Sequence, residues 1–287
     1  MTVNIDQLRV VLLVGGVGGA KLAVGLDKVL NAGHLTVVVN TGDDFVHFGL
    51  KICPDLDTVC YALGGLSDET HGWGLANESW EVRKALEKLA APTWFQLGDR
   101  DLATHLTRTH LLHEKWSLTE ITRHFCEIWR INSKVLPMTD ADSPTFLEGE
   151  DKEILSFQEY FVHQHFQPKV KQILFPNAHN VKPTEEVCKA IDSADLVFIG
   201  PSNPWVSIDP ILALSGMREK ISARKAIAVS PIVQGRAFKG PADKMFTEMG
   251  IKPSSQSVLK HYQPLLSGFI HDQMDDAEFQ NENSSDI

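Results

Sequence analysis

Short apolar runs alternate along this chain with polar segments rich in glycine, proline, asparagine and aspartate. An unbroken run such as Val10–Val14 predicts a strand buried on both faces, which is typical of parallel sheets. Such strands are expected at residues 10–14, 35–39, 94–97, 135–138, 173–175, 196–199 and 226–229. Helical patterns lie between them, so we predict an α/β fold: a Rossmann-like, open, mostly parallel sheet with helices on both faces.

Capping signals mark several helix starts. Pro54 stands at a first helical position, and apolar residues then recur at helical spacing as far as Leu63. Another helix is expected near Asn77, and Ser117–Glu120 has the sequence of a capping box. We predict one domain over residues 1–272, with a smaller inserted α+β subdomain at roughly residues 140–170. Residues 273–287 form an acidic tail that we expect to be frayed and disordered.

Glycines gather directly after the first expected strand: Gly15, Gly16, Gly18 and Gly19, with Lys21 at the opening of a helix. Glycine lets the backbone approach a ligand with no Cβ in the way, and the first turn of a helix attracts anions. The stretch matches neither standard phosphate loop, because the dinucleotide fingerprint needs a third glycine at position 21 and no Gly-Lys-Ser/Thr follows. We expect a phosphate-sized anion here. The alternative is a turn that only lets the helix pack on the sheet.

Polar residues also follow several of the other expected strands. Parallel strands bring such loops to one edge of a sheet, where ligands bind. The residues expected to converge there are Asp43, Asp44, Asp99, Arg100, Asp101, Asp140 and Asn203. Loops are polar in any case because they are wet, which is the simpler explanation.

Four carboxylates near the glycines suit a hard cation. Asp43 and Asp44 follow the second strand, and Asp55 and Asp57 open the next helix. Mg²⁺ prefers one or two carboxylates together with phosphate oxygens. The structural alternatives are turn chemistry for the first pair and helix capping for the second.

Composition narrows the function classes. The formal charge of −10 argues against nucleic acid as a partner, which would need a basic stripe. No run of about 18 apolar residues exists to span a membrane. Four dispersed cysteines without C-x-x-C and an N-terminus without a signal-peptide pattern lead us to expect a cytoplasmic protein. No nucleophile motif is present, so metal-assisted phosphoryl transfer fits better than covalent acyl chemistry.

Seven segments, in order, resemble one family. They are Val14–Lys21, Asn40–Asp44, Pro54–Thr58, Leu97–Asp101, Leu136–Asp140, Gly200–Pro204 and Lys239–Lys244. Together they resemble 2-phospho-L-lactate transferase, the CofD/FbiA family of deazaflavin coenzyme (F-420) biosynthesis, over about residues 10 to 276.

The resemblance implies a transferase with a GDP-linked donor and a deazaflavin acceptor. The phospho-acid, which is phospholactate, phosphoenolpyruvate or similar, moves to the ribityl hydroxyl of 7,8-didemethyl-8-hydroxy-5-deazariboflavin. GMP leaves, Mg²⁺ is required, and the protein forms a homodimer. The residues do not indicate which three-carbon acid the donor carries.

The resemblance also gives the matching residues expected roles. Gly15, Gly16, Gly18, Gly19 and Lys21 hold the diphosphate. Asp43, Asp44 and Asp57 are the expected metal ligands, and Asp44 and Asp57 the expected catalytic residues. Gly200, Ser202 and Asn203 line the nucleotide pocket, Asp57 and Arg100 contact the deazaflavin, and Asp99 completes the substrate-binding set.

Two other functions stay open. A related group of CofD-like regulators shares the glycine turn and binds nucleotide sugars without turnover. A nicotinamide oxidoreductase would also place glycines after the first strand, although the missing third glycine weakens that interpretation.

Overall fold

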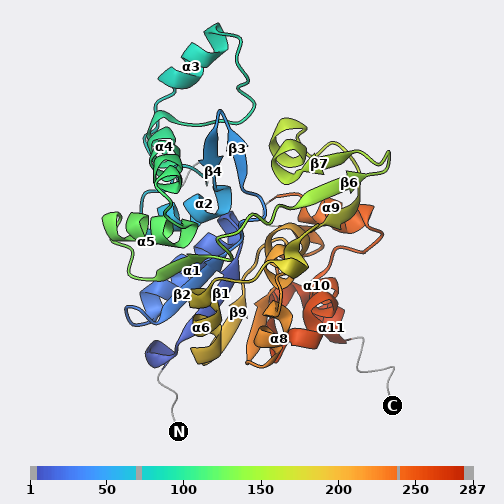
Figure 1. Cartoon of the computed structure of the whole chain (residues 1–287). Helices are drawn as coiled ribbons and strands as arrows, with labels where there is room; N and C mark the ends of the chain where they lie inside the picture. The colour runs from blue at the N-terminus through green and yellow to red at the C-terminus, as the bar shows by residue number, and fades with distance from the viewer. Residues whose placement is uncertain (1–4, 69–72, 238–239, 281–287) are drawn as a thin grey trace.

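The computed structural model describes residues 5–68, 73–237 and 240–280 (Figure 1). A six-stranded sheet lies at its centre, with the order β13-β10-β9-β1-β2-β5 and every neighbouring pair parallel. Its strands are β1 (Val10–Val14), β2 (Leu35–Val39), β5 (Lys134–Pro137), β9 (Leu196–Ile199), β10 (Ala226–Val229) and β13 (Gly268–Ile270). The predicted Rossmann-like α/β fold is confirmed.

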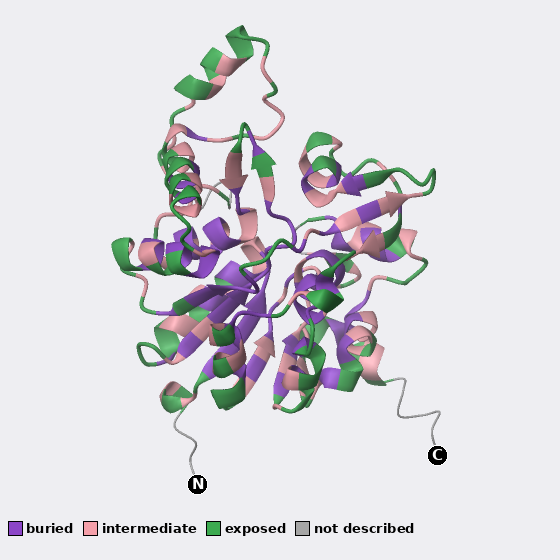
Figure 2. Cartoon of the chain, in the orientation of Figure 1, coloured by how far each residue is buried: buried purple, intermediate pink, exposed green. Residues whose placement is uncertain are grey.

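Strand β1 explains the unbroken apolar run. Successive side chains of a strand point to opposite faces of the sheet. Val11 and Leu13 enter one hydrophobic core, whereas Val10, Leu12 and Val14 enter the other. All five residues are therefore buried, as Figure 2 shows for the strands at the centre of the molecule.

Helices cover both faces of this sheet, as predicted. One face carries α1 (Val17–Val29), α2 (Pro54–Leu63) and α5 (Leu118–Ile128). The other carries α6 (Glu185–Ser193), α7 (Asp209–Leu212), α8 (Met217–Ser222), α9 (Ala242–Glu248) and α10 (Ser255–Tyr262). The remaining helices are α3 (Glu81–Lys88), α4 (Asp99–His113) and α11 (Asp276–Gln280).

An antiparallel sheet lies where the insertion was expected. Strand β6 (Phe146–Gly149) pairs with both β7 (Ile154–Ser156) and β8 (Val170–Leu174), and the π-helical turn Glu159–His163 lies between the last two. Side chains of this insertion, such as that of Tyr160, join one of the central cores. Two small hairpins complete the strands of the described residues: β3 (Phe45–His47) with β4 (Leu50–Ile52), and β11 (Ile232–Val233) with β12 (Arg236–Ala237).

Two expected strands were wrong, and one expected helix begins later than predicted. Residues 94–97 form no strand, because Trp94 and Phe95 are held by ring contacts, for example with Phe45, rather than by a partner strand. The run at 173–175 belongs to β8 of the insertion and not to the central sheet. The helix expected near Asn77 is α3, which begins only at Glu81.

The chain after Gln273 is more ordered than expected. Gln273–Asp275 is a 3-10 turn that leads into α11. Asp275 is buried and accepts hydrogen bonds from Gln234 N (2.8 Å) and Ser255 Oγ (2.7 Å). The predicted fraying is therefore wrong for residues 273–280, and residues 281–287 lie outside the described part. Among the described helices, none has the length and apolar character needed to cross a bilayer.

Candidate active site

A cavity of about 600 Å³ lies beyond the carboxyl ends of β1, β2 and β9, where it also meets the insertion. One part of its wall is polar and is formed by Gly16, Val17, Gly18, Lys21, Asp43 and Asp55. Another part is aromatic and is formed by Trp73, Trp94, Phe95, Phe157, Phe161 and Phe166. Such a cavity suits an elongated ligand with an anionic portion and a flat apolar portion.

The glycine turn is needed for packing and also borders the cavity. A Cβ on Gly18 would lie 2.4 Å from Pro201 O, so the turn needs glycine simply to fit against the loop after β9. The first intrahelical bond of α1 runs from Ala20 N to Gly16 O, so the N–H groups of Val17 and Gly18 have no partner within the helix. Gly16 and Gly18 line the cavity with Lys21. The two alternatives weighed from the sequence are therefore compatible.

Three other expected glycines do not line the cavity: Gly15, Gly19 and Gly200. Gly15 N donates to Ser202 Oγ (3.1 Å), and a Cβ on Gly19 or Gly200 would collide with the Val14 side chain. These three glycines let the turn and the loop after β9 pack closely, and they do not face the cavity. Ser202 and Asn203 do line the cavity, and Asn203 also caps the turn that follows it.

Helix α2 sends its two first-turn carboxylates in different directions. Asp55 and Asp57 are two positions apart, and residues at that spacing do not share a helix face. Asp55 faces the glycine turn, where its carboxylate accepts the Gly16 N–H, and also contacts the loop after β2. Asp57 faces α4. The two side chains therefore have different partners, although both line the cavity.

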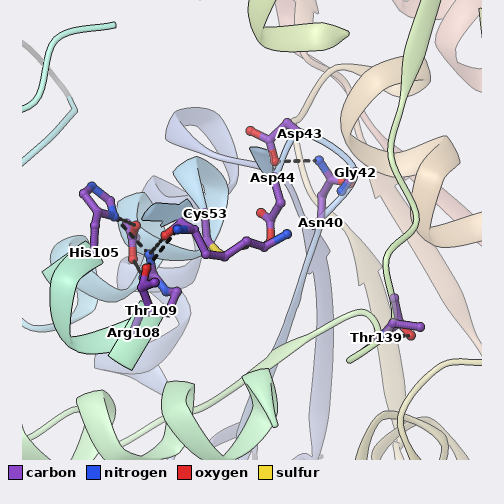
Figure 3. Close-up of polar contacts among 12 residues, drawn as sticks. Asn40, Gly42, Asp43, Asp44, Cys53, His105, Arg108, Thr109 and Thr139 are labelled. Carbon is purple, nitrogen blue, oxygen red and sulfur yellow. Dashed lines mark hydrogen bonds and ion pairs between the residues drawn. The ribbon is translucent and has the colours of Figure 1, made fainter. Parts of the chain in front are cut away.

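Asp43 and Asp55 are held together by a buried amide. Asn40 Oδ1 accepts the Gly42 N–H (2.8 Å), which fixes the side chain so that Nδ2 faces the carboxylates (Figure 3). Asn40 Nδ2 donates to Asp55 Oδ2 (2.9 Å) and Asp43 Oδ1 (3.4 Å). Gln158 of the insertion donates to Asp43 Oδ2 (3.2 Å). Among the described residues, neither carboxylate forms an ion pair with Lys, Arg or His.

The environment of this pair disfavours its negative charge. Desolvation raises the pKa of Asp55 to about 7, against the opposing hydrogen bond from Asn40. Burial and the neighbouring carboxylates Asp55 and Asp44 raise the pKa of Asp43 as well, against a smaller opposing effect of the Lys51 charge. Both groups therefore retain a proton at higher pH than an exposed aspartate does.

Asp44 is placed differently, although it is the next residue. Its Oδ2 lies 3.4 Å from Lys51 Nζ on β4 and accepts from Cys53 Sγ (3.0 Å). Burial raises its pKa to about 6, with Lys51 and Cys53 opposing. Asp44 is not among the residues that line the cavity. Its position behind the wall favours a structural role over the expected catalytic one.

Asp57 of α2 belongs to a buried network that includes residues of α4. Arg108 Nη2 binds Asp57 Oδ1, and His105 Nδ1 lies 3.7 Å from Asp57 Oδ2. Burial raises the pKa of Asp57, and Arg108 opposes this. Asp101 accepts from Tyr61 Oη (2.6 Å); although burial alone would raise its pKa, the contacts with His105 and Tyr61 leave that pKa lowered. These α4 residues share one helix face because they are three or four positions apart.

Asp57, Asp101 and His105 offer three ligand atoms within 4.8 Å of one another. Arg108 argues against a cation there. Its Nη1 lies 3.1 Å from His105 Nδ1, and since arginine only donates, this nitrogen accepts and the ring proton sits on Nε2. The guanidinium charge already balances Asp57. The Asp43–Asp55 pair is thus the better candidate for a cation than a set that includes Asp57.

Only one of the polar residues expected at the ligand-binding edge between positions 99 and 140 lines the cavity. Asp101 lines it, whereas Asp99 accepts from Ser79 Oγ (2.6 Å) and Glu81 N (2.9 Å). Arg100 Nη1 donates to Ala76 O (2.6 Å), and Asp140 accepts from Thr119 N (2.7 Å). None of Asp99, Arg100 and Asp140 lines the cavity.

Part of the segment 239–244 lines the cavity, and another part contacts the insertion. Lys239 lies outside the described residues. Gly240, Pro241 and Ala242 line the cavity, whereas Lys244 Nζ turns to Pro168 O (3.1 Å) and ties α9 to the insertion.

Sequence reasoning missed two residues of this site and undervalued a third. Asn40 follows a strand within a recognised segment, so its position gave a usable signal. Asp55 was weighed as a cation ligand or a helix cap but was left out of the expected ligand set, since the sequence does not say which first-turn carboxylate faces the sheet edge. Gln158 gave no signal, because only the folded insertion carries it to Asp43.

Comparisons with known proteins agree with this geometry. The sequence model of the family described as 2-phospho-L-lactate transferase CofD matches residues 10–285. The chain belongs to the CofD family. Among its relatives, the phosphoenolpyruvate transferase of Thermobifida fusca is 40% identical over 281 residues, covering 93% of this chain and 87% of that protein. The phosphoenolpyruvate transferase of Kitasatospora aureofaciens is 39% identical over 277 residues, covering 94% and 86%.

The fold of this CofD-family chain is also similar to that of solved structures. A Bacillus halodurans protein of the UPF0052 family superposes with a TM-score of 0.60 at 18% identity, covering 96% of this chain and 85% of the other. At that identity the match supports the central sheet and its helices, and nothing about ligands.

Proposed function

We propose that this protein transfers phosphoenolpyruvate from a GDP-linked donor to the ribityl hydroxyl of 7,8-didemethyl-8-hydroxy-5-deazariboflavin in coenzyme F-420 biosynthesis. The observation that carries the proposal is the 40% identity to a phosphoenolpyruvate transferase over 93% of the chain. The CofD family match and the two-part cavity support it. Among the acids left open by the sequence, the names of the relatives favour phosphoenolpyruvate.

The proposed reaction exchanges one phosphorus–oxygen bond for another. The ribityl hydroxyl oxygen attacks the phosphorus that bears the acid, and the bond from this phosphorus to the GMP oxygen breaks. The electron pair leaves with GMP, and the hydroxyl proton passes to a cavity carboxylate: Asp43, Asp55 or Asp57. Such a transfer depends mainly on alignment and charge neutralisation.

The cavity offers a place for each part of the substrates. The N–H groups at Val17 and Gly18, together with Lys21, suit the diphosphate, and Ser202 and Asn203 suit the nucleotide portion. The aromatic wall suits the flat ring of the acceptor, because stacked rings gain from both burial and quadrupole contacts. This order leaves the acceptor hydroxyl near the polar wall.

Mg²⁺ fits the residues at the polar wall. Asp43 and Asp55 supply hard oxygen ligands, and their partners among the described residues are neutral amides and backbone that leave the negative charge uncancelled. We propose that these two carboxylates hold the ion, in place of the expected set Asp43, Asp44 and Asp57. When bound, the ion would neutralise charge on the diphosphate.

Product analysis tests the proposed function. The protein is offered the deazaflavin with guanosine diphosphates that carry enolpyruvate, lactate or glycerate, and products are identified by mass spectrometry. We expect GMP and an enolpyruvyl-phospho-deazaflavin, formed much faster than the other two. Turnover with none of the donors, together with tight binding of a nucleotide sugar in calorimetry, would replace the transferase with a CofD-like regulator. The homodimer stays a prediction that light scattering can test.

A further inference from the structure

The insertion contributes a side chain to the polar wall of the cavity. Thr145 N donates to Gly42 O (2.7 Å), so the insertion begins against the loop that carries Asp43. Phe157 N donates to Thr145 O (3.2 Å), and the next residue, Gln158, is buried with Nε2 3.2 Å from Asp43 Oδ2. A backbone contact and a side-chain contact therefore join two segments more than a hundred positions apart.

Asp43 is thus gripped from two sides by amides. Asn40 donates to Oδ1 from the sheet side, and Gln158 donates to Oδ2 from the insertion side. Because both donors are neutral, they fix the carboxylate without cancelling its charge. Asp44 differs, because Lys51 Nζ forms an ion pair with its carboxylate.

We infer that Gln158, working with Asn40, is a positioning residue that sets the cation affinity of the Asp43–Asp55 pair. This inference rests on the proposed function in its choice of Mg²⁺ as the ion and of Asp43 and Asp55 as its ligands. Hydrogen-bond partners of metal-binding carboxylates fix their orientation, and removing one typically weakens metal binding by roughly 10–100-fold. By this account the insertion is part of the cation site and not only a cover for the cavity.

Direct metal titration of the full chain, without substrates, tests the inference. Mn²⁺ serves as the probe for Mg²⁺, and its binding is followed by electron paramagnetic resonance. Gln158→Met keeps the length of the side chain and removes the donor, so we expect binding roughly 10–100-fold weaker. Gln158→Lys brings an ammonium to Asp43 and should weaken binding further. Gln167→Met is the matched control, because Gln167 is exposed on the same insertion and does not line the cavity.

Two further measurements separate positioning from folding. Thermal melting in EDTA should change little in Gln158→Met. The Mg²⁺ concentration for half-maximal transfer should rise by the same factor as the Mn²⁺ dissociation constant, with the KM for the deazaflavin unchanged. Mn²⁺ binding as tight as wild type in both Gln158 variants would overturn the inference. A wild-type protein that binds no Mn²⁺ would instead refute the proposed metal site itself.

Discussion

Two groups of carboxylates lie within fifteen positions of one another, yet their surroundings differ in kind. Asp43 and Asp55 face the cavity and are held by neutral donors from Asn40 and Gln158. Asp57 is matched by the guanidinium of Arg108, as Asp44 is by the ammonium of Lys51. Enclosed charges are normally paired within the protein. A pair without an ion-pair partner among the described residues therefore marks where a foreign cation is expected.

The largest effect on stability should come from breaking the buried ion pair between Asp57 and Arg108. Arg108→Leu strands Asp57 in a buried place, and breaking a buried ion pair typically costs about 3–5 kcal/mol. Urea unfolding at pH 7 measures the loss. The double variant Asp57→Leu/Arg108→Leu should recover part of it, since no lone charge remains. A loss below about 1 kcal/mol in the single variant would contradict a paired, structural role.

The next largest effect concerns turnover. Asp43→Asn or Asp55→Asn should lower kcat by about 10²–10³-fold, because each removes charge that faces the reacting phosphates. Asp44→Asn, behind the wall, should lower it less than about tenfold. Steady-state kinetics at saturating Mg²⁺ measure all three. The expectation drawn from the sequence, that Asp44 is catalytic, would be supported instead if Asp44→Asn lost the most activity.

A smaller effect is expected in the pH dependence of stability without metal. The pKa of Asp55 is raised to about 7, so the folded state holds a proton that the unfolded state releases near pH 4. Stability from this group is full below pH 4 and falls as the pH rises to about 7. Asp55→Asn should therefore raise the Tm in EDTA by a few degrees at pH 7.5 and not at pH 4. An equal shift at both pH values would point to packing rather than charge.

The smallest effect concerns the KM for the deazaflavin. It compares Trp94 of the aromatic wall with Arg100, which the resemblance suggested as a contact. Trp94→Leu should raise the KM for the deazaflavin by about 3–10-fold, since one ring contact is lost. Arg100→Ala should change it by less than about twofold, because the Arg100 side chain binds Ala76 O outside the cavity. A larger effect of Arg100→Ala would show that this side chain turns toward the acceptor when it binds.

The sequence was informative wherever one local rule decided the outcome. The apolar run Val10–Val14 and the position of the glycine turn after it were predicted correctly, because strand burial and loop position follow from pattern. The sequence was misleading where contacts with residues distant in the chain determine the structure. An apolar run at 173–175 does not reveal which sheet it joins, and Trp94–Leu97 has the composition of a strand without a neighbour to pair with.

The same limit explains the site. Asp43 and Asp44 are adjacent, and only Asp44 is paired with Lys51 of the β3–β4 hairpin. Asp55 and Asp57 look alike as helix-opening residues until α4 supplies Arg108 to one of them. Such distinctions depend on contacts between elements that no local spacing reports.

The close fit between Gly18 and Pro201 O, with the bond from Gly15 N to Ser202 Oγ, locks two loops together that are 187 positions apart. An engineer who wished to graft this glycine turn onto another α/β scaffold would have to carry the loop after β9 along with it. Chimaeras of CofD relatives should likewise tolerate crossover points that exchange both loops as a unit better than those that separate them.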